Sequence, residues 1–283
     1  MENSKYQEQW MEITPGRCRR NKKTVGQHIA ELKEQVHQVY NMVRGNMSRR
    51  SFGFVLGDLW LIGEPILYAG LYYFLVSVLF RVRGNDIGFF LIFTSVIFWR
   101  LHLRMLLASP NMVSAKASVL KQTNFPFQMI IYEFVGNELG FFLFKLIVLF
   151  TFLIFGGIFP KATWLLLPFV LITQLTFTMS LVMIFASLGI FVKDISRIIG
   201  VLVPIWWYLS PGMYGISRVP PEYRTFFKLN PFSHILPAYR DILLHDKTPE
   251  LWPLLFIFGV SLATFILGVK LLNRSRYYLY KYT

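Results

Sequence analysis

Apolar runs alternate with polar segments along the 283-residue chain, and six of them are near the length that crosses a bilayer as a helix. The predicted spans cover about residues 58–80, 87–107, 126 onward, 162–191, 198–216 and 251–272. This pattern predicts an all-α integral membrane protein, with a transmembrane domain of six helices in residues 51–283.

Two polar segments precede the first predicted span. Residues 1–23 are basic and are expected to form a flexible N-terminal segment. Residues 24–50 predict an amphipathic helix, because Thr24 and Gln27 form a capping box and apolar residues then recur at spacings of four and three. This helix either lies in the membrane interface on the cytoplasmic side or docks on a partner. A dimeric coiled coil is a third interpretation, for which three heptads are short.

The connection between the fifth and sixth spans, residues 217–250, contains two short helical patterns, each opened by proline. In the second, residues 231–244, apolar side chains recur on one face, and Asn230 is the expected N-cap. Pro237 is expected to kink or split this helix. Both patterns are too short to cross a membrane, so we expect re-entrant or interfacial helices at the outer leaflet. An ordinary external loop with interfacial aromatics is the alternative.

Charge supports the membrane interpretation. The chain is 54% hydrophobic and only 16% charged, with a net charge of +14. With six spans, 20 of the 29 basic residues fall on the side that holds both termini, eight fall on the other side, and Lys145 lies within a span. The positive-inside rule therefore places both termini in the cytoplasm, and no nucleic-acid partner is needed to explain the charge. The single cysteine, Cys18, excludes an internal disulfide.

Glu64 and Lys145 are charged residues within predicted spans. Glu64 interrupts the first span, and a carboxylate there is expected to face other helices or water rather than lipid. Lys145 follows Glu138 by seven residues, which makes the two candidates for an ion pair two turns apart.

No catalytic or metal site is predicted. The sequence has no G-x-x-x-x-G-K-[ST] phosphate loop, no HExxH and no CxxC, and its five histidines do not cluster with carboxylates at ligand spacing. His234 and Asp241 are seven residues apart, and a solvated interfacial pair explains them better than a catalytic one. The chain is therefore not expected to hydrolyse ATP alone.

The order of these features resembles the membrane subunit of ATP-binding-cassette exporters that move lipid-linked cell-envelope polymers: wall teichoic acid, O-antigen and capsule. The resemblance covers about residues 25–283 and rests on the amphipathic helix and on SRRSFGFVLGDLWLIGEPIL at 48–67, KASVLKQTNFP at 116–126, the KD turn at 193–194 and LSPGMYGISRVPPEYRTFFKLNPFSHILPAYRDILL at 209–244. Its most specific part is NP…YRD…L. The chain departs from the family at Glu64, where many relatives have a different polar residue, and in its longer basic extension.

The resemblance implies a homodimer that works with two copies of a separate ATPase, which binds ATP and Mg. This chain itself would then need no cofactor. Cytoplasmic residues would transmit closure of the ATPase to the spans, although topology explains basic residues at this edge equally well. The implied coupling residues are Val36, Val39, Lys116, Lys121, Lys193, Asp194 and Arg197.

The resemblance also implies a substrate path and an outer gate. The path residues would be Tyr68, Tyr72, Phe98, Trp99, Arg100, Arg104, Lys145, Trp206, Trp207 and Tyr214. The gate residues would be Pro231, Leu236, Pro237, Tyr239, Arg240 and Asp241. For single aromatics, lipid-facing packing is the more ordinary explanation, and for Arg100 and Arg104 it is snorkelling or pairing with Glu133 and Glu138.

The function implied by the resemblance is export of an undecaprenyl-linked polymer across the bacterial plasma membrane, with wall teichoic acid slightly ahead of other polysaccharides. Its partners would be a second copy, the ATPase, the polymer and membrane lipid. A drug or lipid exporter of the same architecture is one alternative. A membrane-embedded transferase acting on a lipid carrier is another, and it would require Glu64, Glu138, Asp241 or His234 to be essential for chemistry in the purified protein.

Overall fold

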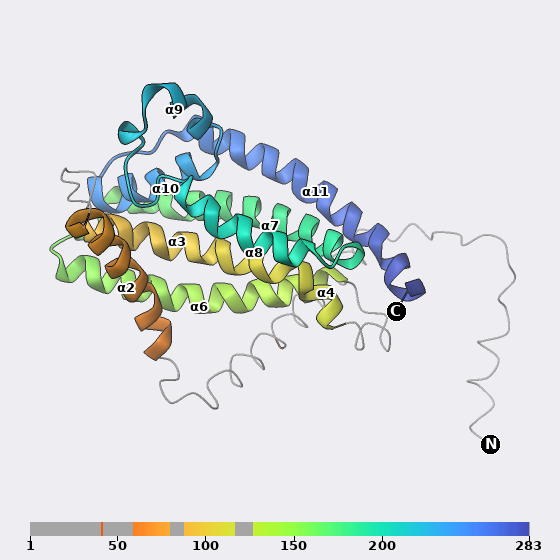
Figure 1. Cartoon of the computed structure of the whole chain (residues 1–283). Helices are drawn as coiled ribbons and strands as arrows, with labels where there is room; N and C mark the ends of the chain where they lie inside the picture. Colours follow the sequence, from red (N-terminus) through yellow and green to blue (C-terminus); the bar gives the residue numbers. More distant parts are fainter. Residues whose placement is uncertain (1–40, 42–58, 80–87, 117–126, 283) are drawn as a thin grey trace, which may run out of the picture. The chain divides into compact units, whose positions relative to one another are not determined.

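The computed structural model describes residues 41, 59–79, 88–116 and 127–282, and the described helices belong to one compact unit, residues 39–283 (Figure 1). The described residues form helices and turns with no strand, so the predicted all-α fold is confirmed. The α-helices are α2 (Leu59–Tyr73), α3 (Phe89–Ala108), α4 (Met112–Ala115), α6 (Phe127–Phe155), α7 (Leu167–Phe191), α8 (Ile195–Tyr208), α9 (Pro221–Lys228), α10 (Phe232–Arg240) and α11 (Leu251–Tyr282). The predicted flexible segment and amphipathic helix, residues 1–50, lie almost entirely outside the described residues.

Within the described residues, five helical stretches are long and apolar enough to cross a membrane. They are Ile62–Leu79, Phe89–Ala115, Gln128–Phe155, Ala162–Phe191 and Leu251–Ser275, and they correspond to the first, second, third, fourth and sixth predicted spans. Three of them include short non-α turns: π-helix at Phe74–Leu79 after α2, and 3-10 turns at Ala162–Leu166 before α7 and at Ser109–Asn111 before α4. The chain is therefore a multi-pass membrane protein.

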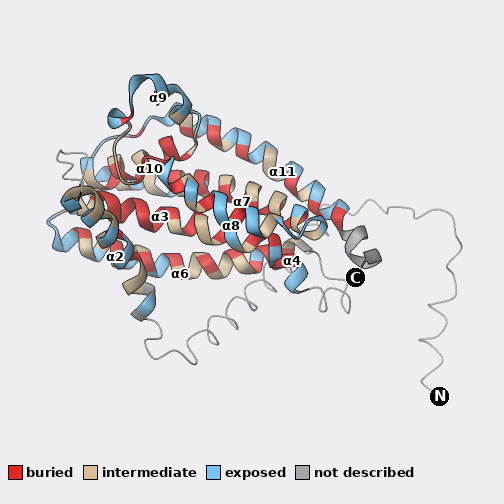
Figure 2. Ribbon diagram, viewed as in Figure 1, coloured by how far each residue is buried: buried red, intermediate tan, exposed pale blue. Residues whose placement is uncertain are grey.

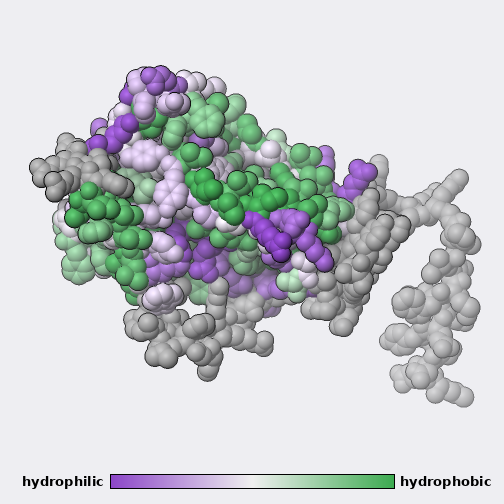
Figure 3. Space-filling view, in the orientation of Figure 1, coloured by the Kyte–Doolittle hydropathy of each residue, from purple (hydrophilic) through white to green (hydrophobic). Residues whose placement is uncertain are grey.

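The fifth predicted span is shorter than its pattern suggested. α8 has 14 residues and ends at Tyr208, which gives about 21 Å of helix against a hydrocarbon core of about 30 Å. It ends where Pro211 and Gly212 follow, since proline lacks the N–H that would continue the helix. Its outward face stays apolar, with Val201 and Leu202 exposed (Figure 3).

α3 is the helix around which the others pack. It contacts α2, α6, α7, α8 and α10, and 72% of its apolar stretch is buried within this chain (Figure 2). The longest packed interface joins α7 to α11. It is close because Gly268 has no side chain: a Cβ there would lie 2.8 Å from the Cβ of Met183.

The segment after α8 divides into an exposed helix and a buried one. α9 exposes Tyr223 and Phe226, whereas α10 packs against α3 and α7 with Phe232 and Leu236 completely buried. The predicted amphipathic helix after Asn230 is thus confirmed. The predicted split at Pro237 is not found there: the α-helix continues to Arg240 and becomes π-helix at Asp241–His245.

Candidate functional site

Aromatic side chains from three helices line a cavity of about 200 Å³ between α2, α3 and α8. Its lining residues are Tyr68, Tyr72, Val96, Trp99, Arg100, Leu103, Pro204, Trp207 and Tyr208. Five of the ten residues predicted for the substrate path, Tyr68, Tyr72, Trp99, Arg100 and Trp207, are therefore brought together from separate parts of the sequence. Their role in transport stays a prediction.

The rings in this cavity form a connected row. Tyr68 and Tyr72 are one helical turn apart on α2, with ring centroids 6.3 Å apart. Tyr72 lies 5.5 Å from Trp207, and Trp207 lies 5.4 Å from Trp99. Such a row presents apolar ring faces together with a polar phenol edge, which is a surface that suits sugars as well as hydrocarbon chains.

Charged side chains form a cluster beside this cavity. Glu64 of α2 pairs with Arg100 of α3, and it also lies 3.8 Å from Arg104 and 3.7 Å from Lys145 of α6. Arg104 in turn pairs with Glu138 at 3.0 Å. The expectation that Glu64 faces other helices is confirmed, because its side chain is 16% exposed and contacts both α3 and α6.

The cluster lies deep along the spans. Arg100 follows the start of α3, Phe89, by eleven residues, which is about 16 Å of helix and close to half the thickness of the hydrocarbon core. The guanidinium carbon of Arg100 also lies 4.2 Å from the ring centroid of Tyr68, so the same cation contacts an aromatic face of the cavity. Ionisable residues at this depth are costly, which makes them candidates for function.

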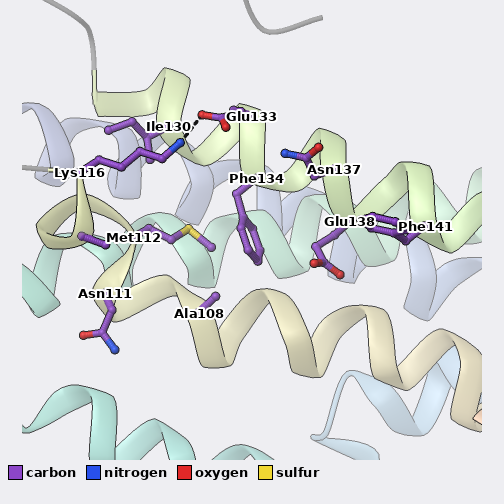
Figure 4. Close-up of a pocket in the computed structure, with 11 residues that line it drawn as sticks. Ala108, Asn111, Met112, Lys116, Ile130, Glu133, Phe134, Asn137, Glu138 and Phe141 are labelled. Atoms are coloured by element: carbon purple, nitrogen blue, oxygen red, sulfur yellow. Dashed lines mark hydrogen bonds and ion pairs between the residues drawn. The ribbon is translucent and has the colours of Figure 1, made fainter. Parts of the chain in front are cut away.

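A second, larger cavity of about 550 Å³ lies between the end of α3, α4 and α6 (Figure 4). Phe134 and Glu138 point from α6 toward α3, and Lys116 reaches Glu133, with 2.5 Å between its Nζ and a carboxylate oxygen. The lining residues are Ala108, Asn111, Met112, Ala115, Lys116, Ile130, Glu133, Phe134, Asn137, Glu138 and Phe141. The predicted coupling residue Lys116 thus lies in a cavity wall.

Two predicted path residues contact predicted gate residues instead of the aromatic cavity. Phe98 is completely buried and stacks on Tyr239 of α10, with centroids 3.5 Å apart and planes at 11°. The carbonyl of Tyr214 accepts a hydrogen bond from Arg240. Arg240 is itself buried, and it also donates to the Ser95 hydroxyl at 2.8 Å and to the carbonyl of Gly212.

Asn230 is a structural residue whose full role the sequence did not reveal. Its amide nitrogen donates to the Leu209 carbonyl at 3.0 Å and to the Ser210 hydroxyl at 2.9 Å. Its amide oxygen accepts from the Trp206 indole at 3.0 Å and from the Phe232 N–H at 3.1 Å. The last bond is the predicted N-cap; the other three tie the end of α8 to the start of α10. Only the Asn-Pro pair was a visible signal.

The remaining predicted residues are spread over the molecule. Lys193 and Asp194 are exposed in the turn between α7 and α8, and Arg197 lies 3.6 Å from Asp194. Asn111, before α4, donates to Ser196 at 2.9 Å and so joins the segment that contains Lys116 to the segment that contains Lys193, Asp194 and Arg197.

Trp206 packs against His102 and Phe232 rather than into the cavity. Pro231, Leu236, Pro237 and Asp241 belong to α10 or its ends, and Val36, Val39 and Lys121 lie outside the described residues.

Comparison with known proteins gives consistent findings. The family model described as ABC-2 type transporter matches residues 37–244. Two proteins from Klebsiella pneumoniae named O-antigen export system permease protein RfbA are 27% and 28% identical over 225 residues, covering 79% of this chain and 86% of the relatives. A protein of the same name from Myxococcus xanthus is 25% identical over 237 residues, covering 83% of this chain and 91% of the relative.

Proposed function

Because the chain belongs to the ABC-2 type transporter family, we propose that it is the permease subunit of an exporter that moves a lipid-linked envelope polysaccharide across the bacterial plasma membrane. The ATPase would be a separate subunit that binds ATP and Mg, and the working unit would contain two copies of each. Both termini would lie in the cytoplasm. The relatives that carry the name O-antigen export system permease support this substrate class.

The single observation that carries the proposal is the aromatic row Tyr68–Tyr72–Trp207–Trp99 with Arg100 beside it. A glycan chain needs contacts that tolerate sliding, and aromatic faces supply them because an apolar contact is not tied to one hydrogen-bond donor or acceptor. Hydrogen-bonding pockets would instead hold one sugar in one place. Either a polysaccharide of the O-antigen kind or wall teichoic acid can use this surface, and wall teichoic acid is the finer proposal to be tested.

ATPase closure would reach this cavity through the cytoplasmic turns. The contact of Asn111 with Ser196 links the turn after α3 to the start of α8, and Gly189 at the end of α7 lies against the Pro110 main chain. Lys116, Lys193, Asp194 and Arg197 border these turns and are the proposed contacts with the ATPase. At the other end, α10 would act as an outer gate, since Asn230 and Arg240 join it to the turn after α8.

Gene inactivation in the native host is the direct test of function. Loss of export should remove the polymer from the cell surface and leave its lipid-linked form inside the cell. Analysis of sugars and polyol phosphates in the retained material then distinguishes a polysaccharide from wall teichoic acid. Unchanged surface polymer would contradict the proposal. Purification of the tagged chain should also yield a P-loop ATPase in a one-to-one ratio.

Complementation tests the cavity itself. Tyr72→Ala should lower export roughly fivefold, because one aromatic stack contributes about 1 kcal/mol. Trp252→Ala is the matched control, since Trp252 lies on α11, 80% exposed and away from the cavity. Equal export by both variants, at equal amounts of folded protein, would show that the cavity is not part of the transport path.

A further inference from the structure

A series of charged side chains from α2, α3 and α6, alternately positive and negative, connects the two cavities. Arg100 lines the aromatic cavity, and Glu138 lines the larger cavity between α3, α4 and α6. Between them the order of contacts is Arg100–Glu64–Arg104–Glu138, in which each neighbouring pair is within ion-pair distance. A charged group that enters one cavity therefore finds a continuous series of charged partners leading to the other.

The cluster carries an excess of positive charge among the described residues. Arg100, Arg104 and Lys145 are cations, and all three lie within ion-pair distance of the same carboxylate, Glu64. The second carboxylate, Glu138, contacts Arg104. Three cations grouped around one carboxylate in a low-dielectric region favour an anion of higher charge in place of that carboxylate. Guanidinium forks match the oxygens of a phosphate as well as they match a carboxylate.

Glu64 is better placed than Glu138 to give up its partners. Its side chain is 16% exposed compared with 4% for Glu138. It also belongs to α2, of which only 11% of the apolar stretch is buried within this chain, whereas α6 is buried over 33%. A displacement of α2 would withdraw the Glu64 carboxylate from three cations at once.

We infer that this cluster is a binding site for a phosphate or diphosphate group, and that the Glu64 carboxylate occupies the site until such a group replaces it. The inference rests on the proposed function and deepens it: the ligand class is a phosphate ester on an apolar chain, the head of a lipid-linked substrate. Tyr68 and Tyr72 then lie next to the phosphate, where the first sugar or the start of the lipid chain would follow. Glu64 acts as the specificity-determining residue, since a neutral head group cannot displace it.

Binding to the complete complex tests the inference. The permease with its ATPase is placed in micelles of dodecyl maltoside, which contains no phosphate, and equilibrium binding of radiolabelled farnesyl diphosphate is compared with that of farnesol and of inorganic pyrophosphate. Farnesyl diphosphate should bind, and farnesol should bind at least about tenfold more weakly. Binding by pyrophosphate alone would assign the site to a free phosphate rather than to a lipid head group.

Variants then identify the side chains. Arg100→Gln should weaken binding of farnesyl diphosphate by at least about tenfold, whereas Glu64→Gln should strengthen it severalfold because the competing carboxylate is gone. A purely structural role predicts weaker binding for both variants. Lys161→Gln is the matched control and should bind normally, since it removes one positive charge from an exposed pair with Asp246 at 3.4 Å. Lys145→Gln gives a second test, with weaker binding expected, if Glu64→Gln fails to assemble.

Equal binding of farnesyl diphosphate and farnesol, or weaker binding by Glu64→Gln in a folded complex, would overturn the inference. The proposed function has a different failure: gene inactivation that leaves the surface polymer unchanged. Reduced export in the Tyr72→Ala strain together with unselective binding would therefore retain the polysaccharide exporter and reject the phosphate site.

Discussion

Two arginines, the buried Arg240 beside the outer turn and the partly buried Arg100 in the charge cluster, are held in different ways. Arg240 donates to the main-chain oxygens of Gly212 and Tyr214 and to the hydroxyl of Ser95. Backbone oxygens are part of the fold, so these bonds break only if the turn itself opens. While these bonds hold, α10 and the turn after α8 therefore stay joined and move as one unit.

Arg100 contacts side chains instead. Its partners Glu64 and Tyr68 both belong to α2, the span with the smallest buried share within this chain. A carboxylate on such a helix can be withdrawn or replaced without unfolding anything. Low exposure alone therefore does not make an arginine structural: the nature of its partner, backbone or side chain, decides whether the contact is fixed or exchangeable.

Removing the stack at the outer region should have the largest effect on stability. Tyr239→Ala deletes a completely buried ring that stacks on Phe98, and the cost should be about 3–5 kcal/mol, as for other buried aromatics. Tyr239→Phe is the control, because the hydroxyl is buried without a hydrogen-bond partner in the described structure, and it should change stability by less than about 1 kcal/mol. Thermal unfolding in detergent measures both, and similar losses for the two would contradict the stack as the main contribution.

Arg240→Met should have the next largest effect and lower the free energy of unfolding by about 3 kcal/mol. The substitution removes the donor to the carbonyls of Gly212 and Tyr214 and to the hydroxyl of Ser95. Protease sensitivity of the turn at residues 209–215 should rise with it, since these bonds hold that turn. Arg240→Lys keeps the charge, and its stability should lie between that of Arg240→Met and that of the natural protein. An unchanged cleavage pattern in Arg240→Met would show that the turn is stable without the hydrogen bonds from Arg240.

Asn230→Ala should cost about 1–2 kcal/mol, the range for loss of a cap with further hydrogen bonds. Asn230→Asp keeps the oxygen that accepts from Trp206 and Phe232 but loses the donor to Leu209. If the gate requires the hydrogen bonds from the Asn230 amide nitrogen to the end of α8, Asn230→Asp should retain most of the stability and lose export. Export by Asn230→Asp equal to that of the natural chain would limit Asn230 to capping.

Glu64→Gln should have the smallest effect on stability, about 1 kcal/mol, because the amide oxygen still accepts from Arg100 and Glu138 still pairs with Arg104. A double-mutant cycle of Glu64→Gln with Arg100→Gln measures their coupling directly. The comparison predicts a smaller loss of stability than for Arg240→Met. A larger loss would mean that the inner cluster is as fixed as the outer turn.

Much of the fold could be predicted because it depends on local patterns. Length and hydropathy located the spans that the structure describes, and the Asn-Pro pair located the start of α10. The orientation of Glu64 toward other helices followed from the cost of a carboxylate in lipid. The end of α8 was placed several residues too late, because hydropathy measures the length of an apolar run and not the point at which Pro211 and Gly212 stop the helix.

The pairing of residues between helices was beyond the sequence. A span that is apolar all round carries no stripe to show which face meets which neighbour, so the grouping of Tyr72, Trp99 and Trp207 around one cavity could not be inferred from their positions.

By itself, the sequence determined that this chain is an all-α, multi-pass membrane protein whose spans bury a few charged residues, because those properties follow from the solvation of each residue. Only the tertiary structure decided that Glu64 meets Arg100, Arg104 and Lys145, and that Arg240 meets backbone oxygens. The physical reason is that solvation acts on each residue separately, whereas an ion pair depends on the distance between atoms of different helices, which packing alone sets.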